Sequence, residues 1–152
     1  MSAWRHSQRR TLVTVEPRPY QPSDREACLA VFDSNGLSAR EPFDRFLDDP
    51  ANFTVLEHDG SIAGCGGYSI ALGGAAVLVH GMIRRDLQGI GLGRFLLLFR
   101  LRQISKSASE IRFARLSTTQ ELAGFYQKQG FKPASAASGG VVELVMKLAV
   151  CA

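Results

Sequence analysis

Three glycines alternate with apolar residues in the stretch QGIGLG, which runs from Gln88 to Gly93. It follows the apolar run AAVLVHGMI (75–83), which predicts a buried strand, and it leads into the apolar run FLLLF, which predicts a helix. The first N–H groups of a helix have no partner inside the helix and carry partial positive charge. Glycine lets such a backbone approach a ligand closely. The pattern therefore predicts a phosphate cradle, with Arg84, Arg85 and Arg94 adding positive charge nearby.

Two common phosphate-binding patterns do not fit this stretch. The dinucleotide pattern G-x-G-x-x-G would require glycine at position 94 or 96, where the chain has Arg94 and Leu96. The P-loop pattern G-x-x-x-x-G-K-[ST] does not occur in the chain. The alternative interpretation of the glycines is that they only allow a helix and a sheet to pack closely.

The stretch IRRDLQGIGLGRFLL resembles the acyl-CoA-binding motif of the GCN5-related N-acetyltransferases (GNAT), which reads Q/R-x-x-G-x-G/A after an apolar strand. A second stretch, FYQKQGF, resembles the Y-x-x-x-G-F feature that ends a late helix in that family, with Tyr126, Gly130 and Phe131 in the matching places. The expected order of elements also matches, so the resemblance extends from about Leu12 to Leu148.

The resemblance implies a fold and a cofactor. The fold is a single α/β domain with a mixed, mostly antiparallel sheet, helices on both faces and splayed central strands. The cofactor is acetyl-CoA, whose pantetheine arm would pair with the strand before the motif while the loop amides hold its pyrophosphate. Thr119 stands where many members have an asparagine that contacts the cofactor arm. The implied cofactor-binding residues are Gly81, Met82, Ile83, Gln88, Gly89, Ile90, Gly91, Leu92, Gly93, Arg94 and Thr119.

The resemblance also implies two catalytic positions. Tyr126 matches the tyrosine that commonly protonates the departing thiolate. Transfer to an amine also needs an acceptor for the amine proton, and His80, on the expected central strand, is a candidate because the pKa of histidine suits the task. Packing in the core is the alternative role for both. Other candidates for the base are a water molecule, Glu41, Asp44, Glu57 and His58, whereas Cys65 is expected to be a buried small residue.

Local patterns predict the elements that position these residues. The first half should contain a strand in LVTVEP ended by Pro17, a helix in PSDREACLAVFDSNG capped by Ser23 or Asp24, and a short helix in EPFDRFLDDP. A hairpin should follow, with Asp59-Gly60 as a type I′ turn and a bulge or close contact at the glycines of AGCGG.

The second half should add a helix from about Gly91 to Lys106 and the strand IRFARLST. A helix in TQELAGFYQKQG should come next, with Thr118 or Thr119 as its cap, and Thr118 with Glu121 fits a capping box. The strands FKP and VVELVMKL complete the order β-α-α-β-β-β-α-β-α-β-β, which is typical of an α/β sheet of mixed direction.

Length and composition are those of one globular domain. The chain has 152 residues, of which 45% are hydrophobic and 21% charged. Residues 1–11 are expected to form a disordered basic tail and residues 12–149 the acyltransferase domain. No apolar run is long enough for a membrane span, and no secretory signal follows the basic start. The three cysteines are scattered, which favours neither a disulfide framework nor a metal site and suits a reducing cytoplasm.

These observations predict an N-acetyltransferase that moves an acetyl group from acetyl-CoA to a primary amine by direct transfer in a ternary complex. Two alternatives remain: a catalytically weak acyl-CoA-binding sensor of the same fold, and a nucleic-acid-binding module that uses the arginines around the glycine stretch. The basic residues are spread along the chain, which disfavours nucleic acid as a partner despite the net charge of +4. The acceptor could be a small-molecule or a protein amine, and the chain could be a monomer or a homodimer.

Overall fold

The computed structural model describes residues 14–37, 39–107, 110–135 and 139–148. The expected basic tail at residues 1–11 lies outside the described residues. No helix in the described ranges is both long enough and apolar enough to cross a membrane.

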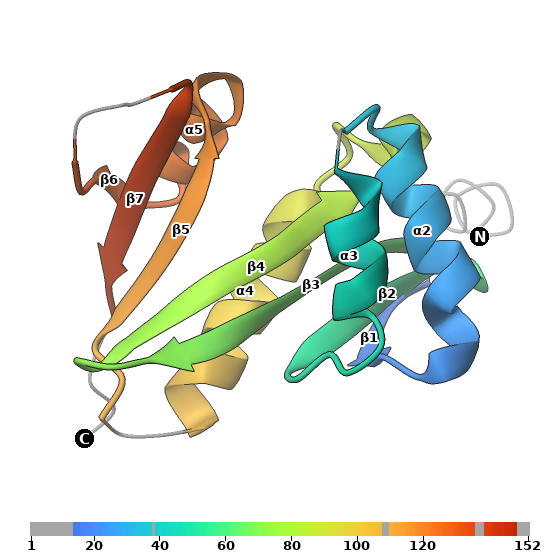
Figure 1. Cartoon of the computed structure of the whole chain (residues 1–152), viewed down its shortest axis with the longest axis horizontal. Helices are drawn as coiled ribbons and strands as arrows, with labels where there is room; N and C mark the ends of the chain where they lie inside the picture. Colours follow the sequence, from blue (N-terminus) through green and yellow to red (C-terminus); the bar gives the residue numbers. More distant parts are fainter. Residues whose placement is uncertain (1–13, 38, 108–109, 136–138, 149–152) are drawn as a thin grey trace, which may run out of the picture.

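In the described residues, seven strands form one sheet with the order β1-β2-β3-β4-β5-β7-β6 (Figure 1). The pairings are antiparallel except that of β4 with β5, which is parallel. The mixed, mostly antiparallel sheet predicted from the sequence is therefore confirmed. The strands are β1 (Val15–Pro19), β2 (Phe53–His58), β3 (Ser61–Ala71), β4 (Ala75–Ile83), β5 (Phe113–Thr119), β6 (Lys132–Pro133) and β7 (Val141–Lys147).

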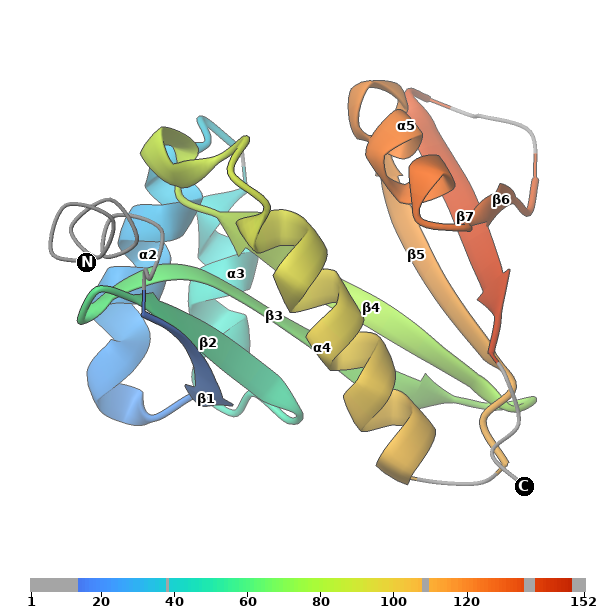
Figure 2. The ribbon, with the colours of Figure 1, turned by 180° about the vertical axis from the view of Figure 1, so that it is seen from behind.

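Helices cover both faces of the sheet. Helices α2 and α3 lie on one face, and α4 crosses the other face diagonally with α5 beside it over β5 and β7 (Figures 1 and 2). The predicted order of elements is confirmed. The α-helices are α2 (Arg25–Ser34), α3 (Arg40–Phe46), α4 (Leu92–Ser107) and α5 (Gln120–Lys128), and the short 3-10 helices are η1 (Pro22–Asp24) and η2 (Arg85–Leu87).

The apolar core is divided by the sheet. On the α4 side, one cluster joins Leu97 and Ile104 of α4 to Leu116 of β5 and Leu144 of β7. On the other side, the apolar face of α2 packs with α3, β2 and β3. Each helix thus buries its apolar stripe against one face of the sheet, which fixes the helix ends relative to the strands.

The predicted hairpin turn is confirmed. Asp59 and Gly60 both have positive φ angles, 52° and 83°, as a type I′ turn requires. The turn joins β2 to β3, and the side of Gly60 where a Cβ would point is open.

Three local predictions are wrong in one detail each, although the strand β1 and the cap positions Asp24 and Thr119 are as predicted. Strand β1 continues past Pro17 to Pro19, which is possible because β1 lies at the sheet edge and pairs only with β2. Thr118 still belongs to β5, so the capping box does not form, and Thr119 caps α5 by accepting the N–H of Leu122 at 3.3 Å. Asp24 makes no side-chain cap for α2, because its carboxylate is held by Arg18.

Candidate active site

The central strands diverge and leave a cleft. Strands β4 and β5 pair only where residues 75–77 face residues 113–115, and beyond that point they separate (Figure 1). The predicted splay is therefore present. A cleft of about 250 Å³ lies in the gap. It is lined by Leu37, Leu78, His80, Gly81, Met82, Arg100, Leu116, Ser117, Thr118, Thr119, Leu122 and Tyr126.

A β-bulge shapes the wall of this cleft. Cys65 of β3 pairs with Met82, but Gly67 pairs with Val79, so His80 and Gly81 of β4 together face the single residue Gly66. The extra residue in this pairing is on β4. In the pairing of β3 with β2 the extra residue is Ala63, so the bulge or close contact predicted from AGCGG is also present. His80 has a φ angle of 52°, a left-handed conformation that is uncommon for a residue with a side chain. Bulges re-aim side chains, and this one places His80 in the cleft wall.

The His80 ring packs against α3 while it lines the cleft. Its centroid lies 5.0 Å from that of Phe43 and 4.5 Å from that of Phe46. Burial lowers the pKa of His80 below its ordinary value of 6.5, because the apolar surroundings disfavour the imidazolium ion. The ring is therefore neutral at pH 7 and has a lone pair for accepting a proton.

Tyr126 reaches the same cleft from α5. Its ring is held edge-on by Phe125 at 5.1 Å and by Phe131 at 5.9 Å between centroids, and it packs against the core cluster on the α4 side. The structure thus brings together the two residues predicted as catalytic. They approach the cleft from opposite faces of the sheet, since His80 contacts α3 and Tyr126 belongs to α5.

The glycine loop has the geometry of an anion cradle. Gly89 and Gly91 have φ angles of 83° and 95°, and nothing lies within 4 Å of the place where a Cβ would stand on either. The first helical hydrogen bond of α4 runs from the N–H of Phe95 to the oxygen of Gly91 at 3.0 Å. The N–H groups of Leu92, Gly93 and Arg94 come before that bond and have no helical partner. The loop therefore combines open space beside its glycines with backbone donors that have no helical partner, and this combination fits a pyrophosphate.

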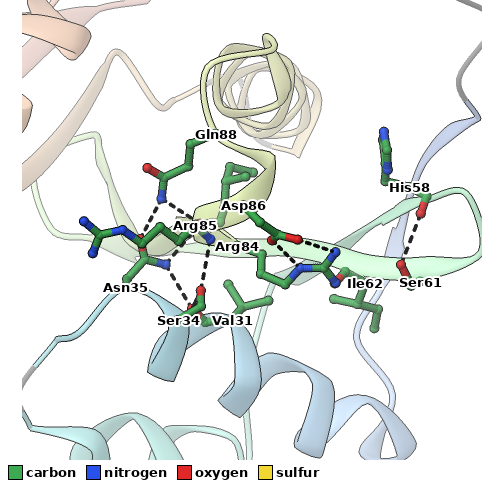
Figure 3. A network of polar contacts seen from close by, with 11 residues as sticks. Val31, Ser34, Asn35, His58, Ser61, Ile62, Arg84, Arg85, Asp86 and Gln88 are labelled. Carbon is green, nitrogen blue, oxygen red and sulfur yellow. Dashed lines mark hydrogen bonds and ion pairs between the residues drawn. The ribbon is translucent and has the colours of Figure 1, made fainter. Parts of the chain in front are cut away.

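The Gln88 side chain holds this loop in place. Its Nε2 donates to Oδ1 of Asn35 at 2.6 Å and to the oxygen of Ile83 at 2.9 Å (Figure 3). Asn35 also donates to the oxygen of Ile83, at 3.0 Å. Gln88 therefore ties the loop to the end of α2 and to the end of β4, and its amide hydrogens are used within the protein.

Two of the three arginines expected near the cradle are engaged. Arg84 forms an ion pair with Asp86 at 2.7 Å and donates to the oxygen of Ile62 (Figure 3). Its charge is thus balanced locally, contrary to the expectation that it adds free positive charge. Nε of Arg94 donates to Oε1 of Gln129 at 3.1 Å, which ties the first turn of α4 to the end of α5.

Hydroxyl groups line the β5 side of the cleft. Ser117, Thr118 and Thr119 follow one another at the end of the strand. Ser117 donates to Oε1 of Glu143 on β7 at 2.6 Å. The Thr119 hydroxyl accepts from Leu122, so its own hydrogen is left to donate.

The acidic candidates for the base lie outside this cleft. Asp44 is held by Arg25 at 2.6 Å, and Glu57 is held by Arg18 at 2.8 Å. Neither of them, nor Glu41, nor His58, is among the described residues that line the cleft. The structure therefore does not bring these candidates into the cleft that His80 and Tyr126 share.

Cys65 is also unsuited to chemistry, as expected. It is completely buried. A hydrogen bond with Cys28 and burial raise the pKa of its thiol well above the ordinary value. A thiol that stays protonated is a poor nucleophile.

Sequence reasoning missed Arg100. Arg100 is only 3% exposed and lines the cleft from α4. The signal in the sequence is the position of Arg100 within the apolar run of α4, flanked by Phe99 and Leu101.

The arrangement of these elements is that of a known family. A family model described as acetyltransferase (GNAT) domain matches residues 49–133. The chain belongs to the GNAT acetyltransferase family, and the resemblance stated from the sequence is confirmed. A search of curated protein sequences finds no match to the chain.

Solved structures share the fold. The ribosomal-protein-S18-alanine N-acetyltransferase of Escherichia coli is 15% identical with a TM-score of 0.75, over 91% of this chain and 97% of that one. The PaiA N-acetyltransferase of Thermoplasma acidophilum, solved with coenzyme A, is 17% identical with a TM-score of 0.68, over 89% and 99%. A GNAT acetyltransferase of Staphylococcus aureus Mu50 is 14% identical with a TM-score of 0.73, over 90% and 100%. At these identities the similarity establishes the fold.

Proposed function

We propose that the protein transfers an acyl group, acetyl in the simplest case, from acyl-CoA to a primary amine by direct transfer in a ternary complex. The observation that carries the proposal is the cleft between β4 and β5, which is lined by both His80 and Tyr126 and lies beside an open glycine loop. Family membership supports acyl transfer in general, and the coenzyme A bound by the related PaiA structure supports the choice of cofactor.

The proposed cofactor contacts follow the chain from the loop into the cleft. Backbone N–H groups from Gly89 to Arg94, including those of Ile90, Gly91, Leu92 and Gly93, would bind the pyrophosphate, and Gln88 would keep the loop in position. The pantetheine arm would lie along Gly81, Met82 and Ile83, whose edge toward β5 is left open by the splay. The Thr119 hydroxyl would donate to the same arm in place of the usual asparagine.

When bound, the cofactor supplies an acyl group activated as a thioester. His80 accepts the proton of the attacking amine, because its neutral ring faces the cleft from the α3 side. Tyr126 donates its phenolic proton to the departing sulfur from the α5 side. A backbone N–H of the segment 81–83 stabilises the negative charge that develops on the acyl oxygen. Most of the rate enhancement would come from holding the two reactants together in the cleft.

A paired assay tests this proposal. Calorimetric titration with coenzyme A measures binding, and release of free thiol from acetyl-CoA in the presence of a panel of primary amines measures transfer. We expect coenzyme A to bind and at least one amine to accelerate thiol release over the rate in buffer. Failure of coenzyme A to bind would contradict both the cradle and the proposed reaction.

A catalytically weak acyl-CoA sensor is the second candidate. The tight packing of His80 between Phe43 and Phe46 favours it, because a ring held in an apolar cluster can serve structure alone. This candidate predicts coenzyme A binding without amine-dependent thiol release. Nucleic acid is disfavoured as a partner, because Arg100 is buried and Arg84 is paired with Asp86.

A further inference from the structure

Arg100 is a buried cation in the wall of the cleft. It lies in the middle of α4, and its residue is only 3% exposed. Nη1 donates to the oxygen of Gly67 at 3.3 Å, and Nε has no hydrogen-bond partner among the described residues. A guanidinium carries five N–H donors and keeps its charge in proteins. A hydrogen bond with the Tyr126 hydroxyl is a further contact of the Arg100 side chain. The carbonyl of Gly67 and this hydroxyl leave part of the guanidinium donors without a partner among the described residues.

The bulge is built around this guanidinium. A Cβ on Gly66 would lie 3.0 Å from Cζ of Arg100, and a Cβ on Gly81 would lie 2.5 Å from its Nη2. Both distances are shorter than ordinary contacts between side chains. Glycine at these two positions, which face each other across β3 and β4, leaves the space that the guanidinium occupies. The need for this space explains the glycine at position 66 in the AGCGG stretch.

Among the residues that the structure describes, no acidic partner balances the charge of Arg100. None of the ion pairs found among the described residues includes it. The groups that face it are the Cys65 thiol from β3 and the Tyr126 hydroxyl from α5, which is hydrogen-bonded to the guanidinium. Burial lowers the pKa of Arg100, which shows how poorly the surroundings solvate the cation. A buried charge without a counter-charge is costly, so an anion that enters the cleft would be bound strongly there.

We infer that Arg100 binds a carboxylate at the end of the acyl chain, so that the preferred donor is the coenzyme A thioester of a short dicarboxylic acid. This inference rests on the proposed acyl-CoA function. The carboxylate is assigned to the acyl chain because Arg100 and His80 lie on opposite faces of the sheet (Figure 2). Arg100 belongs to α4, whose first turn follows the glycine loop that would bind the cofactor. His80, the proposed acceptor of the amine proton, packs against α3 on the other face.

The chemistry of transfer is unchanged by this assignment. The amine nitrogen forms a bond to the thioester carbon as the carbon–sulfur bond breaks. The amine proton passes to His80, and Tyr126 protonates the sulfur. The terminal carboxylate remains on the transferred group, so the product is an amide with a free acid.

Calorimetry with matched thioesters tests the inference. Succinyl-CoA is compared with butyryl-CoA and malonyl-CoA with propionyl-CoA, because each pair differs by a carboxylate in place of a methyl group. For the unmodified protein we expect the acidic member of at least one pair to bind about 10- to 100-fold more tightly, as a charge-assisted contact would give. Arg100→Met should reduce that ratio to about 1 and leave the affinity for coenzyme A itself unchanged within about threefold.

Two further variants make the comparison specific. Arg102→Met removes an exposed arginine from the same helix and should leave the ratio unchanged. Arg100→Lys keeps the positive charge and should retain part of the preference. If Arg100→Met does not fold, the ratio of the affinities for the acidic and the neutral thioester is still measured in the unmodified protein and in Arg100→Lys. That comparison then tests the inference.

The outcomes separate this inference from the proposed function. Binding of coenzyme A with equal affinity for the acidic and neutral thioesters would overturn the inference and leave the proposed function intact. Absence of binding to every coenzyme A derivative would overturn both. A third assay compares amino acids with their amides as acceptors of an acetyl group. If Arg100→Met removes a preference for the acids in that assay, the carboxylate comes with the acceptor, and the assignment to the acyl chain is wrong.

Discussion

Replacing Gly91 by aspartate tests the phosphate cradle most directly. Nothing lies within 4 Å of the position that the new Cβ would take, so the substitution causes no clash. Its φ angle of 95° is unfavourable for any residue with a side chain, and this strain costs about 1–2 kcal/mol of folding free energy. For a chain of this size the melting temperature should fall by about 2–8 °C. The variant should therefore still fold at 25 °C.

The effect of Gly91→Asp on cofactor affinity should be larger than strain explains. A carboxylate at about 5 Å from a phosphate charge is unfavourable by roughly 1–3 kcal/mol at effective dielectric constants between those of bulk water and the protein surface. We therefore expect coenzyme A to bind about 10- to 100-fold more weakly, measured by calorimetry at low salt. The loss should shrink as salt is added, because salt screens exposed charges.

Gly60→Asp is the matched control for this experiment. Gly60 has a φ angle of 83° and is equally open, but it lies in the turn between β2 and β3. The control should lose similar stability and keep its affinity for coenzyme A. Equal affinities of the Gly91→Asp and Gly60→Asp variants would refute the cradle.

Three further predictions concern single side chains. Tyr126→Phe should lower kcat about 100-fold and change the dissociation constant of coenzyme A less than threefold; equal losses in both would reduce Tyr126 to a packing residue. For an acceptor amine that is neutral throughout the pH range, kcat/KM should rise with pH through a pKa below 6.5 and then level off, because His80 must be neutral to accept a proton. His80→Gln should remove that rise, and an unchanged profile would exclude His80 as the base. Asp24→Asn should lower the free energy of unfolding by about 2–4 kcal/mol, because the carboxylate receives two hydrogen bonds from Arg18 and is nearly buried. Hydrogen bonding to Arg18 lowers the pKa of Asp24 below 3.8. The stabilisation should therefore be complete above pH 3.8 and should disappear as the pH falls through the lower pKa of the folded state. If the difference in stability between Asp24→Asn and the unmodified protein were already lost above pH 5, this assignment would be contradicted.

The order of the elements was predictable because it depends on local patterns. Hydrophobic periodicity and the Asp59-Gly60 turn determine where strands and helices begin and end. The course of β1 past Pro17 was not predictable in this way. Whether proline is tolerated in a strand depends on whether that strand lies at the edge of the sheet, which local sequence does not reveal.

Register and burial limited the prediction of the site. The glycines of β3 indicated an irregularity, which the structure contains, but only the pairing of β3 with β4 shows that β4 also carries an extra residue, His80 or Gly81. Arg100 illustrates the same limit. Its type and its neighbours in sequence do not reveal that Gly66 and Gly81, which are distant along the chain, make room for its guanidinium.

The short contact between β4 and β5 has a consequence for how the protein unfolds locally. The strands share a backbone ladder only over residues 75–77 and 113–115, so the strands from β1 to β4 and the group of β5, β6 and β7 are joined mainly by side chains packed under α4. Amide protons in the two groups should therefore exchange with solvent as separate cooperative units. A slender molecule seated along the open edge of β4 would contact both groups at once, and its binding should merge their exchange into a single, slower process.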